Sequence, residues 1–358
     1  MRHRCHWFQP CTVAGWGRSA VVWRSSNWPY YWSWLLPEEL TMNFPSLLAG
    51  SLWPLALVQA LTLLAVAPLF AGFSRVMRAR MHNRRGPGVL QEYRDIAKLL
   101  QRQSVAPAAA GMAFRSMPYL LTGGLLVIAT ALPMVTLMSP MGAAGDLITV
   151  IYLFAVVRFV FAIAGLDTGS TFTGIGASRE AVLGVLVEPI LLLGLWVAAL
   201  VAGSTSLGAI AARVLHWPLS SSLTLTLAGL ACAFATYIEM GKLPFDMAEA
   251  EQELQEGPLT EYSGAALGML KIGISLKQLV VLQLFLGLFF PFGLVENLTP
   301  LALLTAVVVC LLKLLIAMFM VALIENSVAR LRFLKTSRTT WAGFGLAFLA
   351  LVSWLVAG

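Results

Sequence analysis

The chain has 358 residues, of which 59% are hydrophobic and only 11% are charged. A water-exposed surface needs far more charge, so this composition excludes an ordinary soluble protein and indicates a chain that lies almost entirely in a membrane. The formal net charge of +7 does not point to nucleic acid, because the distribution of cations among the loops follows membrane topology.

The first 41 residues differ from the rest of the chain. They hold six of the eleven tryptophans and four arginines, without the apolar core and small-residue cleavage site of a signal peptide. We therefore expect translation to begin at Met42, which leaves residues 1–41 as an untranslated extension and residues 42–358 as the membrane domain.

Eight apolar stretches in residues 42–358 are long enough to cross a hydrocarbon layer of about 30 Å as helices. A spanning segment must satisfy its own backbone hydrogen bonds, which favours helices over strands, and the runs lack the alternation of a membrane barrel. The sequence therefore predicts an all-α membrane protein with eight transmembrane helices. We place them at Leu47–Phe73, Met117–Ser139, Leu147–Gly165, Ala181–Gly203, Ser222–Ile238, Leu276–Val295, Leu301–Ile324 and Trp341–Ala357.

A basic loop follows the first predicted helix. After the Gly86-Pro87-Gly88 turn, apolar residues recur at helical spacing from Leu90 to Leu100, which predicts an amphipathic helix at the membrane surface. The cations can serve only as a topological anchor, but they are more numerous than topology requires. They are therefore candidates for docking a partner, together with Lys242 further along the chain; the docking candidates are Arg75, Arg78, Arg80, Arg84, Arg85, Arg94 and Lys242.

Ionisable residues also lie inside or at the edges of the apolar stretches: Arg158, Asp167, Glu180, Glu188, Lys313 and Glu325. A charge in the middle of a membrane helix costs at least about 2.5–3.5 kcal/mol, so each needs a partner or a function. Glu188 and Lys313 lie well within their stretches and are candidates for a proton relay or an ion pair. Arg158 and Asp167 are nine residues apart and are candidates for a structural pair, although long side chains also reach the membrane surface on their own.

The segment from Glu239 to Gly264 is rich in carboxylates. Asp246 and Glu249 have the spacing of a capping box, and Gly257-Pro258 is a stop signal, so residues 247–256 are predicted to form a short helix. The interpretation that requires no function is a solvated acidic face. Glu239 is harder to explain in this way, because it ends an apolar helix at the membrane boundary. The candidate proton-path acids of this segment are Glu239, Asp246, Glu249, Glu253, Glu256 and Glu261.

The positive-inside rule gives the orientation. Loops after odd-numbered predicted helices carry nearly all of the cations, whereas the opposite loops offer only Arg213. We therefore expect the charged loops to be cytoplasmic in a bacterial inner membrane. The four cysteines include no C-x-x-C run and the four histidines are not paired in an apolar helix, so we expect no metal and no cofactor in this chain.

Several long motifs resemble a known family. The G-P turn in a basic loop, the segment E-x-x-K-x-P-F-D-x-x-E-A-E-Q-E-L and the T-E-Y-S-G sequence are similar to the complex I subunit 1 family. The resemblance extends from Met42 to the C terminus and includes Lys313, Arg330, Arg332 and Trp341. Within the family, H-N-R-R-G-P-G, G-L-D-T-G-S, G-A-S-R-E and I-E-M-G-K-L-P-F-D most resemble the membrane subunit of formate hydrogenlyase and hydrogenase four, which are group 4 nickel–iron hydrogenases.

The resemblance implies eight membrane helices and a role in docking a peripheral arm. The implied partners are nickel–iron hydrogenase large and small subunits, iron–sulfur subunits and antiporter-like membrane subunits. The nickel–iron centre and iron–sulfur clusters belong to those partners. Glu239 matches the acidic residue at the start of the family's proposed proton path. Lys242 stands where complex I usually has arginine, which keeps the charge but loses bidentate geometry.

One position departs from complex I. Counting back from Gly86-Pro87, the glutamate at the end of the first helix is replaced here by Ser74. This change weakens the implication that the chain handles quinone and fits a hydrogen-evolving relative better. The sequence leaves open a quinone-chamber subunit of a complex I enzyme, a stand-alone ion transporter and a purely structural anchor.

Overall fold

The computed structural model describes residues 52–216, 223–247, 254–295, 299–331 and 333–357. The predicted extension, residues 1–41, lies outside these ranges. The described residues form α-helices and short 3₁₀ turns, and they contain no β-strand beyond two isolated bridges. The helices are α2 Trp53–Met81, α3 Gln91–Leu100, α4 Met112–Ala131, α5 Leu147–Leu166, α6 Thr171–Ala202, α7 Leu207–His216, α8 Leu223–Glu239, α10 Gly264–Phe289, α11 Pro300–Ser327 and α12 Phe333–Ala357, with 3₁₀ turns η1 Gly142–Gly145 and η3 Gly257–Leu259.

The predicted all-helical membrane fold is confirmed. Each of the eight predicted segments overlaps a helix: α2, α4, α5, α6, α8, α10, α11 and α12. The bounds differ by up to twelve residues, since α10 begins twelve residues before the predicted Leu276 and α4 ends eight residues before the predicted Ser139. Seven of these helices are long and apolar enough to cross a membrane, and α8, with 17 residues, is shorter. The predicted amphipathic helix is confirmed as α3, whereas α7 was not predicted.

The acidic segment differs from its prediction at both ends. Met247 is not helical, and Gln255 and Glu256 adopt left-handed backbone angles with φ of 49° and 71°. An α-helix cannot continue through two such residues, so the predicted helix does not reach Glu256. Residues 248–253, including Glu249 and Glu253, lie outside the described residues.

Local sequence signals set several helix ends. Asp146 caps α5 by accepting a hydrogen bond from the Ile148 backbone N–H at 3.1 Å, and Thr299 caps α11 through the Ala302 N–H at 3.3 Å. Gly203 ends α6 in a left-handed conformation with φ of 70°. The N terminus of α4 is capped from a distance, because Asp167 Oδ2 accepts from the Phe114 N–H at 3.1 Å.

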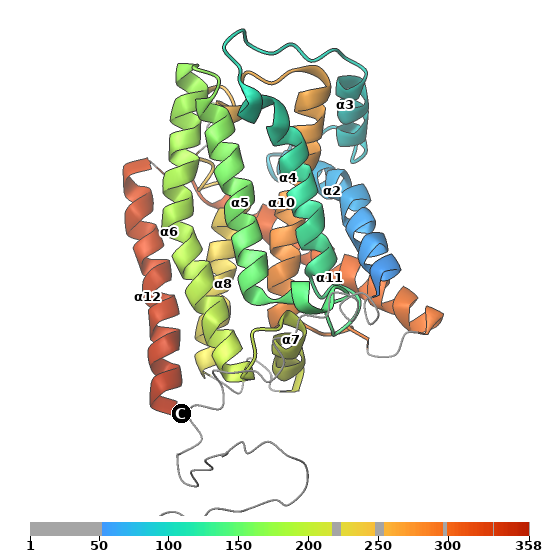
Figure 1. The fold of residues 1–358 in the computed structure, drawn as a ribbon, viewed down its shortest axis with the longest axis vertical. Helices are drawn as coiled ribbons and strands as arrows, with labels where there is room; N and C mark the ends of the chain where they lie inside the picture. The colour runs from blue at the N-terminus through green and yellow to red at the C-terminus, as the bar shows by residue number, and fades with distance from the viewer. Residues whose placement is uncertain (1–51, 217–222, 248–253, 296–298, 332, 358) are drawn as a thin grey trace, which may run out of the picture. The chain divides into compact units, whose positions relative to one another are not determined.

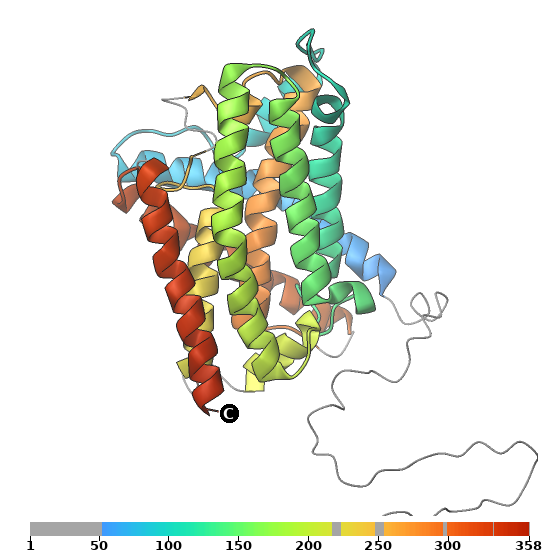
Figure 2. The same ribbon diagram turned by 60° about the vertical axis from the view of Figure 1, so that its left-hand side comes forward.

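Helix α10 lies at the centre of the packing. Within its most apolar window, 72% of the residues are buried, against 22–44% for the other candidate spans. It packs against α2, α3, α4, α7, α8 and α11. Helices α5 and α6 stand side by side in front of it, with α12 beside α6, whereas α2 and α11 run obliquely (Figures 1 and 2). The ends of these helices define two sides, an α3 end and an α7 end (Figure 1).

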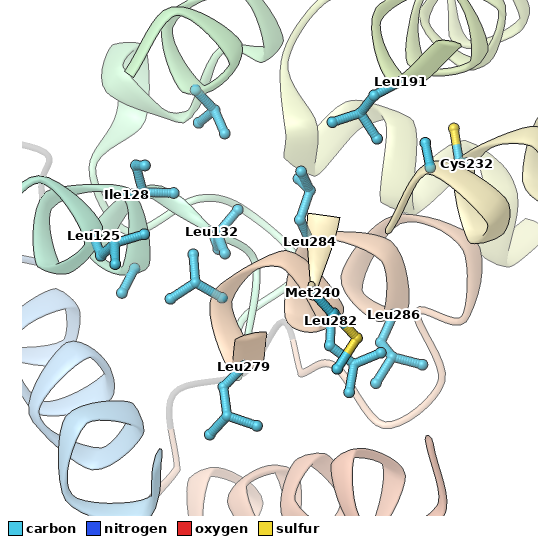
Figure 3. Packing of buried hydrophobic residues seen from close by; sticks show 14 of the residues in the cluster. Leu125, Ile128, Leu132, Leu191, Cys232, Met240, Leu279, Leu282, Leu284 and Leu286 are labelled. Atoms are coloured by element: carbon cyan, nitrogen blue, oxygen red, sulfur yellow. The ribbon is translucent and has the colours of Figure 1, made fainter. Parts of the chain in front are cut away.

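The interior between these helices is apolar. Leu125 and Ile128 of α4, Leu191 of α6, Cys232 of α8 and Leu284 of α10 belong to one buried cluster (Figure 3). Because lipid is as apolar as these side chains, close packing rather than water exclusion holds such helices together.

A buried break follows α4. The helix stops at Ala131 although residues 132–137 remain buried, so its last carbonyls need donors inside the protein. Gln59 Nε2 donates to the carbonyls of Ala129 and Leu132 at 2.8 and 2.9 Å, and Gln283 Nε2 donates to Pro133 O at 3.2 Å. Two glutamines from other helices therefore stabilise the non-helical turn.

Candidate functional site

Five ionisable side chains from four helices meet in one place. Arg158 of α5 contacts Glu239 through Nη2, Glu188 Oε1 through Nη1 at 2.8 Å and Glu180 Oε1 through Nε at 3.9 Å. Lys277 Nζ lies 3.3 Å from Glu180 Oε1 and 3.8 Å from Glu239 Oε2. We refer to these five residues as the Arg158 cluster.

The Arg158 cluster lies within the helix bundle, away from the α3 end. Arg158 is eight residues before the end of α5, which places its Cα about 12 Å along the axis from the α3 end. The side chains of Arg158 and Glu239 are only 12% and 6% exposed, whereas Glu188 is 39% exposed. Charges at this depth persist only when they compensate one another, and the ion pairs supply that compensation.

The compensation is incomplete. Three carboxylates face two cations, so the cluster carries one net negative charge when all five groups are ionised. A single bound proton would make it neutral. Protonation of one carboxylate would leave two carboxylates facing two cations.

The pattern of α6 makes room for Arg158. Glu180, Gly184 and Glu188 are spaced four residues apart and share one face of the helix. A Cβ on Gly184 would lie 2.5 Å from Arg158 Cδ, so only glycine lets the arginine pass between the two acids.

Helix α8 places Glu239 by ending early. Gly241 turns the chain with φ of 63°, and Gln278 Nε2 donates to Met240 O at 3.2 Å. The Tyr237 hydroxyl also donates to Leu243 O across the turn. These contacts hold the last helical residue against α10.

The Arg158 cluster lines a small cavity, which adjoins a larger one. The small one, of about 70 Å³, is lined by Arg158, Glu180, Glu239 and Lys277. The larger one, of about 410 Å³, lies beside it, and the two share Gly241, Asp246, Ile274 and Gln278 in their walls. The two cavities therefore adjoin each other at these four residues.

The wall of the larger cavity is strongly charged. Its cations are Arg75, Arg78, Lys242, Lys271 and Arg330, and its carboxylates are Glu92, Asp246, Glu256 and Glu325. Ion pairs join several of them: Arg75 Nη1 with Glu92 Oε2 at 2.7 Å, Arg330 Nη2 with Asp246 Oδ2 at 2.6 Å, and Arg78 with Glu325. Buried Ser74 lies in the same wall, which is suited to water and protons.

The predicted site residues divide into three groups. Glu188 and Glu239 belong to the Arg158 cluster, whereas Asp246, Glu256, Arg75, Arg78 and Lys242 line the larger cavity. Glu261 is half-buried beside η3, and Arg80, Arg84, Arg85 and Arg94 are exposed. Lys313 lies apart from the cluster, where Nζ donates to Phe290 O at 3.0 Å.

One predicted pair is wrong. Arg158 turns to the three glutamates, and Asp167 instead caps α4. Glu180 and Lys277, which complete the Arg158 cluster, were not among the predicted site residues. The regular spacing of Glu180, Gly184 and Glu188 was the signal that could have identified the face of α6. Within the described residues, no group of three or more His, Cys, Asp or Glu is arranged to hold a metal ion.

The fold and the Arg158 cluster define a multi-pass helical membrane protein with a buried ionic site beside a polar cavity. Residues 54–356 match the model of the family described as NADH dehydrogenase, and the chain belongs to this family. The resemblance to the complex I subunit 1 family is thereby confirmed.

Within this family, the chain is more similar in sequence to two subunits of hydrogenase complexes than to a component of an NADH-quinone oxidoreductase. Over 301 residues the chain is 66% identical to "Formate hydrogenlyase subunit 4" of Escherichia coli, covering 84% of this chain and 98% of that protein. It is 56% identical to "Hydrogenase-4 component C" of the same organism, covering 86% and 97%. A membrane-complex relative from Cereibacter sphaeroides, a component of an NADH-quinone oxidoreductase, is 31% identical, covering 65% and 76%.

A solved structure has the same fold. A chain in the structure of the membrane-bound sulfane sulfur reductase, an archaeal respiratory membrane complex, superposes with a TM-score of 0.72. The match covers 83% of this chain and 97% of the other at 23% identity, which establishes the arrangement of helices and no more.

Proposed function

We propose that this chain is the membrane subunit of a formate hydrogenlyase-type, group 4 nickel–iron hydrogenase complex in the bacterial inner membrane. It docks a peripheral arm on the cytoplasmic side, and antiporter-like subunits lie beside it in the membrane. The nickel–iron centre and iron–sulfur clusters reside in the hydrogenase large and small subunits and the iron–sulfur subunits of that arm. The 66% identity to formate hydrogenlyase subunit 4 supports this assignment.

The docking surface is the α3 end. Arg80, Arg84, Arg85 and Arg94 are exposed there, and the positive-inside rule makes this end cytoplasmic. Arg75, Arg78 and Lys242 lie in the wall of the larger cavity, at the base of the same surface. A partner that covers this end would close the mouth of the cavity.

The chain also contributes to a proton path, and the excess carboxylate of the Arg158 cluster is the observation that carries this part of the proposal. Water in the larger cavity delivers a proton past Asp246 and Gln278 to Glu239. Arg158 contacts both Glu239 and Glu188, so a proton on one acid changes the charge that the other experiences. Reduction in the docked arm shifts this equilibrium, and Glu188 passes the charge laterally.

Other acids serve at the entrance of the path. Glu256 lies in the wall of the larger cavity, and Glu261 is half-buried nearby in the sequence. Glu249 and Glu253 belong to the same acidic segment, and we assign them the same role. The charged wall and Ser74 favour proton traffic over quinone in this cavity.

Glu239→Gln tests the path. We expect the variant complex to keep its hydrogenase activity with an artificial dye, because the metal centres are elsewhere, and to lose most proton movement in vesicles. Asp146→Asn is the matched control, since Asp146 is a half-buried carboxylate outside the cluster and both cavities, and asparagine also caps a helix. Normal proton movement in Glu239→Gln would contradict the path, and loss of the peripheral arm in both variants would point to a purely structural role.

A further inference from the structure

Lys313 is a cation in the middle of an apolar helix. It lies thirteen residues after the start of α11 and fourteen before its end, so about 20 Å of helix extends on each side. Helix α11 is the most apolar of the candidate spans. Lysines near helix ends reach the interface with their long side chains, whereas the backbone of Lys313 lies far from both ends of its own helix.

The described part of the chain compensates this cation only in part. Lys313 Nζ donates one hydrogen bond, to Phe290 O at 3.0 Å at the end of α10. An ammonium group has three donors. Among the residues that the structure describes, no carboxylate lies within ion-pair distance of Lys313.

Lys313 lies between a packed face and an exposed face of α11. Helix α11 packs on α2 and α10 through one stripe that includes Cys310, Leu314 and Met318. Lys313 lies at the edge of this stripe. Ile316 and Met320 follow it on the adjoining face and are 55% and 52% exposed.

We propose that this face of α11 receives a transmembrane helix of a neighbouring membrane subunit, and that this helix carries an Asp or Glu opposite Lys313. Charge complementarity selects the occupant: lipid chains offer no counter-charge at this depth, whereas a carboxylate on a packed helix would bond the remaining donors of the ammonium. Apolar residues of the same helix would cover Ile316 and Met320. This inference rests on the proposed function only for the existence of neighbouring membrane subunits.

The test uses the whole complex purified in mild detergent. A photo-reactive benzoylphenylalanine at Ile316 should cross-link to a membrane subunit. The control is the same group at Phe348, which is exposed on α12, away from the proposed face of α11. Lys313→Met should reduce the co-purifying neighbour at least fivefold, and Lys313→Arg should retain it. Ile316→Trp should reduce it without altering the charge, with Phe348→Trp as its control.

Three results would overturn the proposal. In the first, Lys313→Met and Ile316→Trp both leave the subunit composition unchanged. In the second, the Ile316 probe reacts with lipid alone. In the third, Glu296→Gln reproduces the loss seen in Lys313→Met, which would place the counter-ion in this chain. Loss of proton movement with a complete set of subunits would concern the path through Glu239 and not this interface.

Discussion

The charge imbalance of the Arg158 cluster predicts an asymmetry between two substitutions. In Arg158→Met, three carboxylates remain around Lys277 alone, and the net charge of the site changes from −1 to −2. In Glu239→Gln, two carboxylates face two cations, and the net charge becomes zero. The two substitutions therefore change the net charge of the site by one unit each, in opposite directions.

The magnitudes follow from burial. Removal of one partner from a buried ion pair costs about 3–5 kcal/mol, and Arg158 and Glu239 are only 12% and 6% exposed. Glutamine at position 239 keeps an oxygen and adds a donor, so its cost should be that of one altered hydrogen bond, about 1 kcal/mol. We therefore expect Arg158→Met to destabilise the subunit by at least about 2 kcal/mol more than Glu239→Gln.

Unfolding in mixed micelles with increasing dodecyl sulfate, followed by tryptophan fluorescence, measures the difference. In the double variant that combines Arg158→Met with Glu239→Gln, part of the stability lost in Arg158→Met should be recovered, since one of the uncompensated carboxylates is gone. Arg158→Lys should fall between the two, because lysine keeps the charge but cannot contact three acids at once. Equal costs for Arg158→Met and Glu239→Gln would refute the reasoning from charge.

Two further predictions concern packing. Gly184→Ala should displace the Arg158 side chain and weaken proton movement, whereas Gly174→Ala on the same helix, where a Cβ would meet nothing within 4 Å, should behave as the wild type in the same vesicle assay. Gln59→Leu should destabilise the subunit by about 1–3 kcal/mol in the micelle assay, because the carbonyls at the end of α4 lose their donor. The control is Thr62→Val, which removes an exposed hydroxyl that bonds within α2 and should destabilise the subunit much less.

The sequence was sufficient for the helices because membrane helices are specified by local composition. Each predicted span overlaps a helix, and α3 was found from the spacing of apolar residues after Gly86-Pro87-Gly88. Helix α7 was missed because it has only ten residues and lies within a stretch without long apolar continuity. The acidic segment was misjudged at Gln255 and Glu256, where the backbone adopts left-handed angles that their side chains do not signal.

The partners of Arg158 could not be predicted in the same way. Asp167 is close in sequence, but it lies at the end of α5 and bonds the first turn of α4. Glu180 and Glu188 follow the turn into α6, which runs back along α5 and brings both acids to the height of Arg158. The choice between these partners depends on how antiparallel helices are aligned, and that alignment is a property of the packed helices.

The position of the Arg158 cluster depends on the length of α8. Helix α6 has 32 residues and α10 has 26, but α8 has only 17 and ends at Glu239. Because its last residue does not reach the α3 end, the following turn descends between neighbouring helices, where Gly241 and Asp246 form walls of both cavities. A longer α8 would fill that space with side chains and carry Glu239 toward bulk water. The short helix therefore leaves room for both cavities and keeps the Glu239 carboxylate in the wall of the smaller one.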